Sequence, residues 1–549
     1  MVTEFCFSGY HILRFNPQLV VLFSSVFALF LLCGIARVLF ASVRQCLLVE
    51  GISSLQISVF LFFCLAMALC ALDLDSAALR LVSPDESEAL LAARSLVEGG
   101  TYSIDVNGVL APPRYLPWFS LGVLSPVMAL SGGDLDFGNF LAVGFFFVLL
   151  VEVGILAMLI GRGIASGFLG VAFVLALPWI RFGAGHAVSH VPAAALVLDA
   201  VLWTVLVRRR ALRLSALNIG WGLALPIVAF SLRPLAVGAV IPVAAAILSQ
   251  LSGRQRSVCW VAIALALLSV PIATLLYHFF TFGSIFSSGY YFWLPHIHGD
   301  FSNVFALRFF TLNARVFFLN SGAGALALIV LTLTALRLRR SFKLDSAALR
   351  TVAFFLLAVG LPALLVHLVY FYQSELFFLP ANVLLAILAA AFLGNFLQSY
   401  MSAAWSRGTI VATLAGLSAI AFVRDPLMGG IPEELLTAIE GETPEGSWIV
   451  SDHDPVHLRG LLHGTRFVRP FSLQAEYASK VDFAARCNPP YRDLQSALVP
   501  YSHDPGQQEQ ARYFLDLNGV GEQVFRKEVE TQHLERLSEP LARIVAAPP

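Results

Sequence analysis

The chain has 549 residues, of which 58% are hydrophobic and 13% are charged, and its formal net charge is zero. Because soluble domains carry about 25% charged residues, this composition excludes an ordinary soluble protein and predicts an α-helical polytopic membrane protein. The balanced charge gives no argument for a nucleic-acid partner, and we expect none.

Apolar runs of about 20 residues, the length that crosses a bilayer as a helix, recur from residue 18 onward. We predict about 12 spans, at residues 18–42, 53–74, 137–160, 163–180, 187–207, 214–232, 235–251, 258–280, 319–337, 350–372, 378–398 and 408–423. The first span forms an extra N-terminal transmembrane segment within residues 1–52. The others build a membrane domain over residues 53–423.

One long polar stretch, residues 83–117, interrupts the apolar first half of the chain. It opens with adjacent acids, Asp85 and Glu86, continues as a short helix, and ends at Arg114 and Tyr115 just before the next apolar run. A carboxylate at the mouth of a membrane cavity can act as a general base. We therefore favour Asp85 as the catalytic group, with Glu86 as its helper.

The same acids also fit a structural role. Acids at a helix start cap the helix and interact favourably with its dipole, and Asp85 as N-cap with Glu88 three residues later would form a capping box. This alternative stays open, above all for Glu86 and Glu88.

Basic residues set the predicted orientation, because cytoplasmic loops hold an excess of Arg and Lys. All the basic clusters fall on one side if the apolar run 115–131, which is short and contains prolines, re-enters or lies on the surface instead of crossing. The clusters are Arg37/Arg44, Arg162, Arg208-Arg209-Arg210-Arg213, Arg254/Arg256, Arg337-Arg339-Arg340-Lys343 and Arg407. The outer face then holds loops 75–114 and 281–318 and everything after residue 423.

Arg114 and Arg233 fall at the outer ends of apolar runs in this scheme. An interfacial arginine is costly unless it is paired, and its planar fork suits phosphate, so both are candidate phosphate ligands, with Tyr115 beside Arg114. The alternatives are snorkelling for Arg114 and pairing with a loop carboxylate for Arg233.

Histidines and tyrosines near these loops are further candidates for the binding site. His186 and His190 lie four residues apart at a helix start, which is metal-ligand spacing, but without a third ligand they are more simply polar groups of a wet cavity. A divalent metal is therefore possible, and no cofactor is certain. Tyr290 and Tyr291 could stack on a sugar ring, although aromatic residues are common at membrane interfaces in any case.

Two regions on the outer face have their own predicted structure. Residues 304–319 form an amphipathic stretch of the kind that lies along a bilayer surface. Residues 424–549 are more charged and predict a small extracytoplasmic α/β domain, in which SWIVSDHDP is a strand entering a turn, VHLRGLLHG a helix and TRFVRPF a second strand. The acids and histidine at 452–454 are interpreted as part of that turn.

Taken together, these stretches resemble the polytopic, inverting glycosyltransferases of the GT-C superfamily, near the protein O-mannosyltransferase and aminoarabinose-lipid A transferase branch. The resemblance covers about residues 54–480 and rests on the order of PDESEALLAARSLVEGG-TYSID, PPRYLPWFSLGVLSPVMALSGGD, ALPWIRFGAGHAVSHVPAAALVLDAVLW, SLRPLAV, YHFFTFGSIFSSGYYFW, YQSELFFLPANVLLAILAA and WIVSDHDPVHLRGLLHGTRFVRPF. It implies a polyprenyl-phosphate sugar donor and chemistry outside the cytoplasm, with Asp85 as the catalytic acid and Arg114 near the donor phosphate. The chain departs from the family in its extra first span and at His190, where related enzymes often carry an aspartate.

The expected function is inverting transfer of a sugar from a polyprenyl-phosphate donor to a glycan, lipid or protein acceptor. An Arg-rich, Lys-poor chain fits a bacterial inner membrane with the active site facing the periplasm. One alternative is a transporter or flippase of a lipid-linked saccharide, which is disfavoured because no repeat is visible and the charged residues are expected at helix ends. Another is a non-catalytic subunit of a glycan-assembly complex.

Overall fold

The computed structural model describes most of the membrane domain and the strands that follow it. The described residues are 11–72, 84–106, 109–135, 137–178, 180–290, 301–322, 326, 328–333, 344–372, 374–401, 404–424, 441, 448–451, 466–468, 511–515, 532–538 and 541–546.

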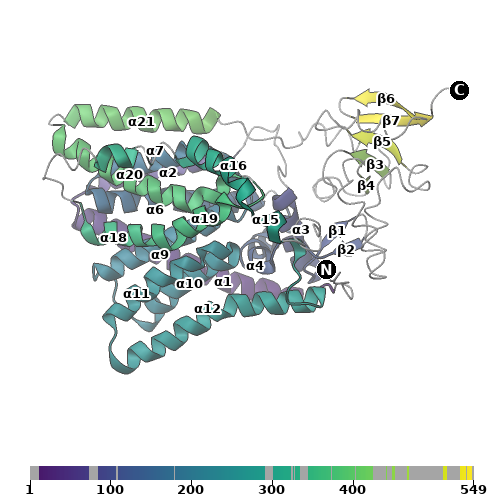
Figure 1. Ribbon diagram of the computed structural model, residues 1–549, viewed down its shortest axis with the longest axis horizontal. Helices are drawn as coiled ribbons and strands as arrows, with labels where there is room; N and C mark the ends of the chain where they lie inside the picture. Colours follow the sequence, from purple (N-terminus) through teal and green to yellow (C-terminus); the bar gives the residue numbers. More distant parts are fainter. Residues whose placement is uncertain are drawn as a thin grey trace.

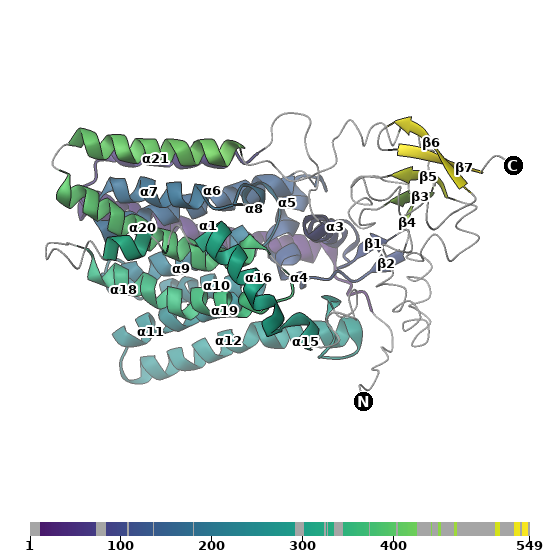
Figure 2. The same cartoon turned by 45° about the horizontal axis from the view of Figure 1, so that its top comes forward.

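Six helical runs in the described part are long and apolar enough to cross a membrane. They are α1 (Pro17–Leu48), α6 (Phe137–Gly161), α9 (His190–Arg208), α12 (Gly253–Phe282), the run Ser346–Leu368 and the run Glu375–Ser399. The fifth comprises α18 (Ser346–Phe355), η5 (Leu356–Gly360) and α19 (Leu361–Leu368), and the sixth comprises η6 (Glu375–Phe378) and most of α20 (Leu379–Tyr400). Figures 1 and 2 show them gathered in one bundle.

Shorter apolar helices complete the bundle. They are α2 (Ser54–Leu69), the run Pro117–Leu130 (α4 Pro117–Phe119, η1 Ser120–Leu124, α5 Ser125–Leu130), α7 (Ile164–Leu175), α10 (Ala216–Leu232), the run Pro234–Gln250 (η2 Pro234–Ala239, α11 Val240–Gln250) and the Arg407–Val423 part of α21 (Ala404–Arg424). The predicted α-helical membrane fold is confirmed. The count of about 12 spans stays a prediction, because a helix of 17 residues rises only about 26 Å and a bilayer core is about 30 Å thick.

The centre of the bundle is formed by α6 and α9, whose apolar windows are 83% and 94% buried. Apart from one buried acid in each, Glu152 in α6 and Asp199 in α9, both helices are apolar on every side, as expected of helices surrounded by other helices. In contrast, the apolar window of α12 is only 6% buried, and that of α1 is 28% buried. These two helices therefore lie at the periphery of the bundle, where their exposed apolar side chains would face the lipid bilayer.

The helices have two distinct ends, and an arginine marks one of them. Arg209, just after α9, lies 3.2 Å from Glu50 between α1 and α2 and 3.1 Å from Asp345 before α18, and it donates a hydrogen bond to the carbonyl of Leu159 in α6. Four chain segments therefore meet at this end, which we call the basic end. The opposite end, where α9 begins at His190, we call the cavity end.

The apolar segment Pro117–Leu130 begins and finishes at the cavity end. Before it, Arg114 is bound to Glu88 of α3 (Pro84–Gly99), and after it, Gly138 at the start of α6 packs against Leu90 of the same helix. The segment is one helical run whose two ends both lie at the cavity end, which agrees with the non-crossing segment expected from the charge pattern. Ser120 holds it against α3 by donating to the carbonyl of Ala89 at 2.9 Å.

The polar loop that follows α2 carries α3 and a small antiparallel pair of strands, β1 (Ile104–Val106) and β2 (Val109–Ala111). The chain turns from α3 toward these strands at Gly100, which has a positive φ of +64°. This conformation favours glycine. A Cβ atom at Gly100 would also collide with the carbonyl oxygen of Phe15, so the turn needs glycine for a second reason.

The N-terminal helix α1 is built into the bundle. Its buried residues recur at the spacing of one helix face, and they are Val20, Ser24, Leu31, Gly34, Ile35, Val38, Ser42 and Cys46. Arg37 lies over the ring of Trp221 in α10, with 5.4 Å between the guanidinium carbon and the ring centroid, and Gly34 leaves space for the same ring. Helix α1 therefore does not stand apart from the body of the fold, although the boundary of the predicted segment 1–52 as a unit stays a prediction.

Short helices replace the predicted interfacial helix at 304–319. They are α15 (Phe301–Val304), η3 (Leu307–Phe309), α16 (Phe310–Arg315) and η4 (Val316–Gly322). Backbone hydrogen bonds join this region to the turn after α19, from Ala306 to Val369 and from Phe371 to Val304. Of the predicted span at 319–337, the structure describes residues 319–322, 326 and 328–333, and these are helical.

The C-terminal region contains a five-stranded mixed sheet in the order β4-β3-β5-β7-β6. Its strands are β3 (Trp448–Ser451), β4 (Arg466–Val468), β5 (Ala511–Leu515), β6 (Gln532–Ser538) and β7 (Leu541–Ala546). Both strands predicted from the sequence are present, and they pair in parallel. The predicted helix VHLRGLLHG and residues 452–454 lie outside the described residues, so the α/β character of the domain stays a prediction.

Candidate active site

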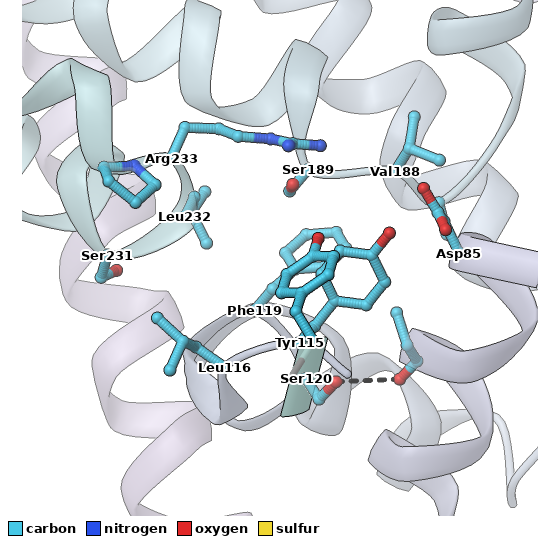
Figure 3. A pocket seen from close by; sticks show the side chains of 14 residues that line it. Asp85, Tyr115, Leu116, Phe119, Ser120, Val188, Ser189, Ser231, Leu232 and Arg233 are labelled. Carbon is cyan, nitrogen blue, oxygen red and sulfur yellow. Dashed lines mark hydrogen bonds between the residues drawn. The ribbon is translucent and has the colours of Figure 1, made fainter. Parts of the chain in front are cut away.

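A small cavity lies at the cavity end of the bundle, with a volume of about 130 Å³. Asp85 from the first turn of α3 and Arg233 from the end of α10 line it, and Tyr115, Ser189 and Tyr290 contribute to its walls. Figure 3 shows Asp85 and Arg233 on opposite sides of the space, each pointing into it. We call it the Asp85–Arg233 cavity.

Asp85 occupies the first turn of α3, which begins at Pro84, so it is not the N-cap that the capping-box alternative requires. Its side chain is 47% exposed, and one carboxylate oxygen lies 3.6 Å from the guanidinium of Arg114. A carboxylate at a helix N-terminus is also stabilised by the helix dipole. Asp85 is thus an accessible carboxylate held at the edge of the cavity, as a general base requires.

Glu86 points elsewhere and does not line the cavity. Its carboxylate is fully buried, accepts a hydrogen bond from the amide of Ala187 at 2.9 Å, and lies 3.2 Å from Nδ1 of His186. These contacts attach α3 to the turn that precedes α9. Glu86 is placed to position that turn, and a catalytic role for it stays a prediction.

Glu88 is bound to Arg114 and does not close a capping box. Nε of Arg114 lies 2.6 Å from the Glu88 carboxylate, and the backbone amide of Arg114 donates to the same group. Burial raises the pKa of Glu88 above its ordinary value, and the positive charge of Arg114 opposes this rise. The charge of Arg114 is therefore largely compensated within the protein, so its predicted phosphate contact would have to compete with Glu88.

Arg233 follows α10 in an extended backbone conformation that directs the chain toward η2. One terminal nitrogen of its guanidinium lies 2.8 Å from Nδ1 of His190. Since a guanidinium can only donate, Nδ1 accepts this bond and His190 is held in the neutral Nε2–H form. Among the ion pairs of the described residues, none involves Arg233.

This uncompensated guanidinium gives the cavity its chemistry. A partly buried arginine without a counter-charge favours an anion, and its planar fork matches phosphate. The alternative in which Arg233 pairs with a loop carboxylate is not what the described residues show. Of the two predicted phosphate ligands, Arg233 is therefore the better placed.

Two tyrosines form one wall of the cavity. Tyr115 and Tyr290 pack edge to face with 5.4 Å between ring centroids, and Arg114 lies 5.8 Å from the ring of Tyr115. Burial raises the pKa of both phenols, so both are neutral near pH 7. Tyr291, the second predicted stacking residue, lies outside the described residues.

The structure separates the two histidines that have metal-ligand spacing. His186 faces Glu86, whereas His190 faces Arg233. In the part of the chain that the structure describes, no three His, Cys, Asp or Glu side chains are grouped as a metal site would need. The described residues therefore give no support for a bound divalent metal.

Two supporting residues were missed from the sequence. His367 in α19 stacks on Phe377 with 4.6 Å between ring centroids, and Phe377 lies 5.6 Å from the ring of His190. They form a layer behind the pair of His190 and Arg233. The sequence offers one signal for this layer, the aromatic residues Tyr370, Phe371 and Tyr372 next to the turn between the predicted spans 350–372 and 378–398.

One sequence-based expectation is wrong. Charged residues were expected at helix ends, yet Glu152 lies within α6 and Asp199 within α9, and both are fully buried beside one another. Neither lines the Asp85–Arg233 cavity. A hydropathy scan averages over single acids, so it hides a pair that the packing of α6 on α9 brings together.

Comparison with solved structures places the fold. The chain is similar to ArnT from Cupriavidus metallidurans bound to undecaprenyl phosphate, with 14% identity, a TM-score of 0.54, and coverage of 91% of this chain and 100% of the other. It is similar to the same protein in the apo state, with 14% identity, a TM-score of 0.55, and coverage of 90% and 99%. An Archaeoglobus fulgidus oligosaccharyltransferase tethered to an acceptor peptide matches at 12% identity and a TM-score of 0.49, over 90% and 74%.

No protein-family model matches the sequence, and no curated protein matches it significantly. At these identities the likeness shows the fold alone. The helical membrane fold that the sequence resemblance implied is therefore shared with these ArnT structures.

Proposed function

We propose that this chain is an inverting glycosyltransferase that moves a sugar from a polyprenyl-phosphate donor to an acceptor hydroxyl on the outer face of the membrane. The observation that carries the proposal is the opposed placement of Asp85 and Arg233 across one cavity. The chain shares its fold with ArnT, whose solved structure holds undecaprenyl phosphate, and this likeness supports a lipid phosphate as the leaving group.

The chemistry follows from the two charges. Asp85 takes the proton of the acceptor hydroxyl while the oxygen forms a bond to the anomeric carbon of the sugar. The bond from that carbon to the phosphate oxygen breaks, and its electron pair leaves with the lipid phosphate. Arg233 stabilises the charge that develops on this phosphate, which is the kind of preorganised electrostatic stabilisation that contributes most to many enzymes.

A base and an anion site on opposite walls suit a single displacement. The acceptor approaches from the side of Asp85 and the phosphate departs toward Arg233, so the anomeric centre inverts. Tyr115 and Tyr290 supply an aromatic wall against which a sugar ring can pack.

Orientation is part of the proposal. The excess of arginine at the basic end favours the cytoplasm for that end and the periplasm of a bacterial inner membrane for the cavity end. The acceptor class, whether glycan, lipid or protein, would then be one that is available outside the cytoplasm.

The test uses purified wild type and Asp85→Asn with a total extract of polyprenyl-phosphate sugars, and mass spectrometry follows the release of free polyprenyl phosphate. Release by wild type alone is the expected result. Equal release by both proteins would contradict the role of Asp85, and Glu86 would be tested next.

A transporter of a lipid-linked saccharide is the second candidate. The buried acids Glu152 and Asp199 favour it, because acids within transmembrane helices often mark ion or proton pathways. Movement of a lipid-linked saccharide across vesicles without sugar transfer would support this function. Co-purification of an inactive chain with a complete glycosyltransferase would instead support a non-catalytic subunit.

A further inference from the structure

A second, larger hollow lies beside the Asp85–Arg233 cavity. Its volume is about 590 Å³, and apolar side chains make up nearly all of its lining. One wall is formed by α1 with Phe23 and Phe27, the opposite wall by α12 with Val270 and Ala273, and η1 contributes Gly122 between them. We call it the α1–α12 groove.

The groove is connected to the candidate active site. Ser231 of α10 lines both the α1–α12 groove and the Asp85–Arg233 cavity, and Arg233 follows it by two residues. A molecule that placed an anionic group at Arg233 could therefore pass Ser231 and continue into the groove.

The groove is apolar where it opens to the periphery of the bundle. Phe23 is 68% exposed, and the α12 helix that faces it is almost entirely peripheral. Gly122 lines the hollow opposite the ring of Phe27, from which a Cβ atom at this position would lie 3.4 Å away, an ordinary contact distance. Such a lining suits a hydrocarbon chain better than a peptide or glycan, because it offers few hydrogen-bonding side chains, namely Asn16, Ser24, Trp118, Ser231 and Ser269.

The walls of the groove are fixed to the site by hydrogen bonds. The amide of Phe15, just before α1, donates to Gly100 at 2.6 Å, and the amide of His11 donates to Thr281 of α12 at 2.8 Å. Across the groove, the indole of Trp118 reaches the hydroxyl of Thr274 at 3.4 Å. The start of α1 is therefore tied both to the loop that carries Asp85 and to the end of α12.

We propose that the α1–α12 groove holds the isoprenoid chain of the lipid whose phosphate binds at Arg233. The proposal rests on the proposed function for the identity of that lipid. It gives the extra N-terminal helix a direct part in substrate binding, because α1 supplies one wall of the groove. An ordinary acyl chain of the bilayer is the competing occupant.

The experiment fills the groove and compares two probes. Ala273→Trp places an indole in the groove. Leu268→Trp places one at a residue of α12 that is 54% exposed and does not line the groove. Each protein, in nanodiscs, is titrated with a long-chain polyprenyl phosphate and with a phosphate that carries a single isoprene unit.

We expect Ala273→Trp to weaken binding of the long-chain probe about tenfold or more, because displacing a single isoprene unit removes several buried carbons. The single-unit probe should bind all three proteins alike. The proposal is overturned if Ala273→Trp and Leu268→Trp bind the long-chain probe equally, or if wild type does not prefer the long chain.

A photo-crosslinking residue at Val270 gives a second measurement that tolerates small changes in stability. It should capture a labelled long-chain polyprenyl phosphate, and the same group at Leu268 should not. Unlabelled polyprenyl phosphate should prevent this capture, and unlabelled phosphatidylglycerol should not. If phosphatidylglycerol prevents it as effectively as polyprenyl phosphate does, a bilayer chain is the occupant and the proposal is overturned.

These results separate the groove from the reaction. Chain-length-dependent binding that is lost in Ala273→Trp, without any sugar transfer by wild type, would retain the groove and reject the glycosyltransferase. Sugar transfer by wild type that Ala273→Trp leaves unchanged for long-chain donors would retain the enzyme and reject the groove.

Discussion

The guanidinium of Arg233 donates a hydrogen bond to Nδ1 of His190 across 2.8 Å, and this contact fixes the direction of the arginine without neutralising it. Many polar partners could orient an arginine, but an acidic one would cancel its charge. The resemblance described above places an aspartate at this position in many related enzymes. Here a neutral imidazole leaves the full positive charge of Arg233 facing the cavity.

This pairing makes a direct prediction for His190. In His190→Asp the new carboxylate would pair with Arg233, and we expect affinity for polyprenyl phosphate to fall about tenfold or more. His190→Asn keeps a neutral acceptor and should stay close to wild type. Binding titrations with polyprenyl phosphate measure both, and equal affinity of His190→Asp and His190→Asn would contradict the proposed anion site.

Arg233 itself should be needed for the donor. Arg233→Gln removes the charge and should lower kcat/KM by about 100-fold, corresponding to about 2.7 kcal/mol of transition-state stabilisation. Arg233→Lys should recover part of this loss, since it keeps the charge but not the planar fork. Arg94→Gln is the matched control, because Arg94 lies on the exposed side of α3, paired with Glu98 at 2.8 Å. An equal loss of activity in Arg94→Gln would contradict a specific role of Arg233 in stabilising the donor phosphate.

The two adjacent acids should behave differently. Asp85→Asn should lower kcat by about 100-fold to 10,000-fold, the range for a positioned general base. Glu86→Gln keeps an oxygen that can accept from the Ala187 amide, so we expect nearly normal turnover. Glu86→Leu loses that acceptor and should lower thermal stability. Sugar-transfer rates and unfolding temperatures of the three proteins separate chemistry from positioning, and a larger kinetic loss in Glu86→Gln than in Asp85→Asn would reverse the assignment.

Glu88 and Arg114 should be coupled in stability. Removing one partner of a buried ion pair leaves an unpaired charge and costs about 3–5 kcal/mol. Glu88→Gln and Arg114→Gln should therefore each destabilise the protein, and the double variant should lose clearly less than the sum of the two. Resistance to denaturant provides the measurement. Additive losses would mean that the contact contributes little, and Arg114 would again be as strong a candidate phosphate ligand as Arg233.

Gly100 is expected to be sensitive to any added side chain. Gly100→Ala should destabilise the fold by more than the ~1–2 kcal/mol that a left-handed backbone costs an alanine, because the Cβ also meets the Phe15 carbonyl. Gly132→Ala is the control, since Gly132 has a similar φ of +67° and open space around it. Equal unfolding temperatures of the two variants would show that the Phe15 carbonyl can move away from an added Cβ atom without loss of stability.

The membrane character of the fold was predictable because it depends on local composition. A run of 20 apolar residues identifies a span wherever it occurs, and the excess of arginine in certain loops also predicted that the segment Pro117–Leu130 returns to its own side. Asp85 stood out for the same reason, as an acid directly after an apolar run.

Partner choice was not predictable in the same way. Glu88 is as good a capping residue as it is a partner for Arg114, and only the return of the chain after α3 brings the two together. The apolar windows around Glu152 and Asp199 likewise concealed an acid pair that depends on the packing of α6 against α9.

The sequence by itself determined that this protein is a helical membrane protein with an acidic and a basic group near one end, because hydropathy and charge act through neighbouring residues. Only the tertiary structure decided that Arg233, unlike Arg114, has no ion-pair partner among the described residues, and that α1 lines a groove leading to it. Both depend on contacts between residues far apart in the chain, and local sequence carries no record of those contacts.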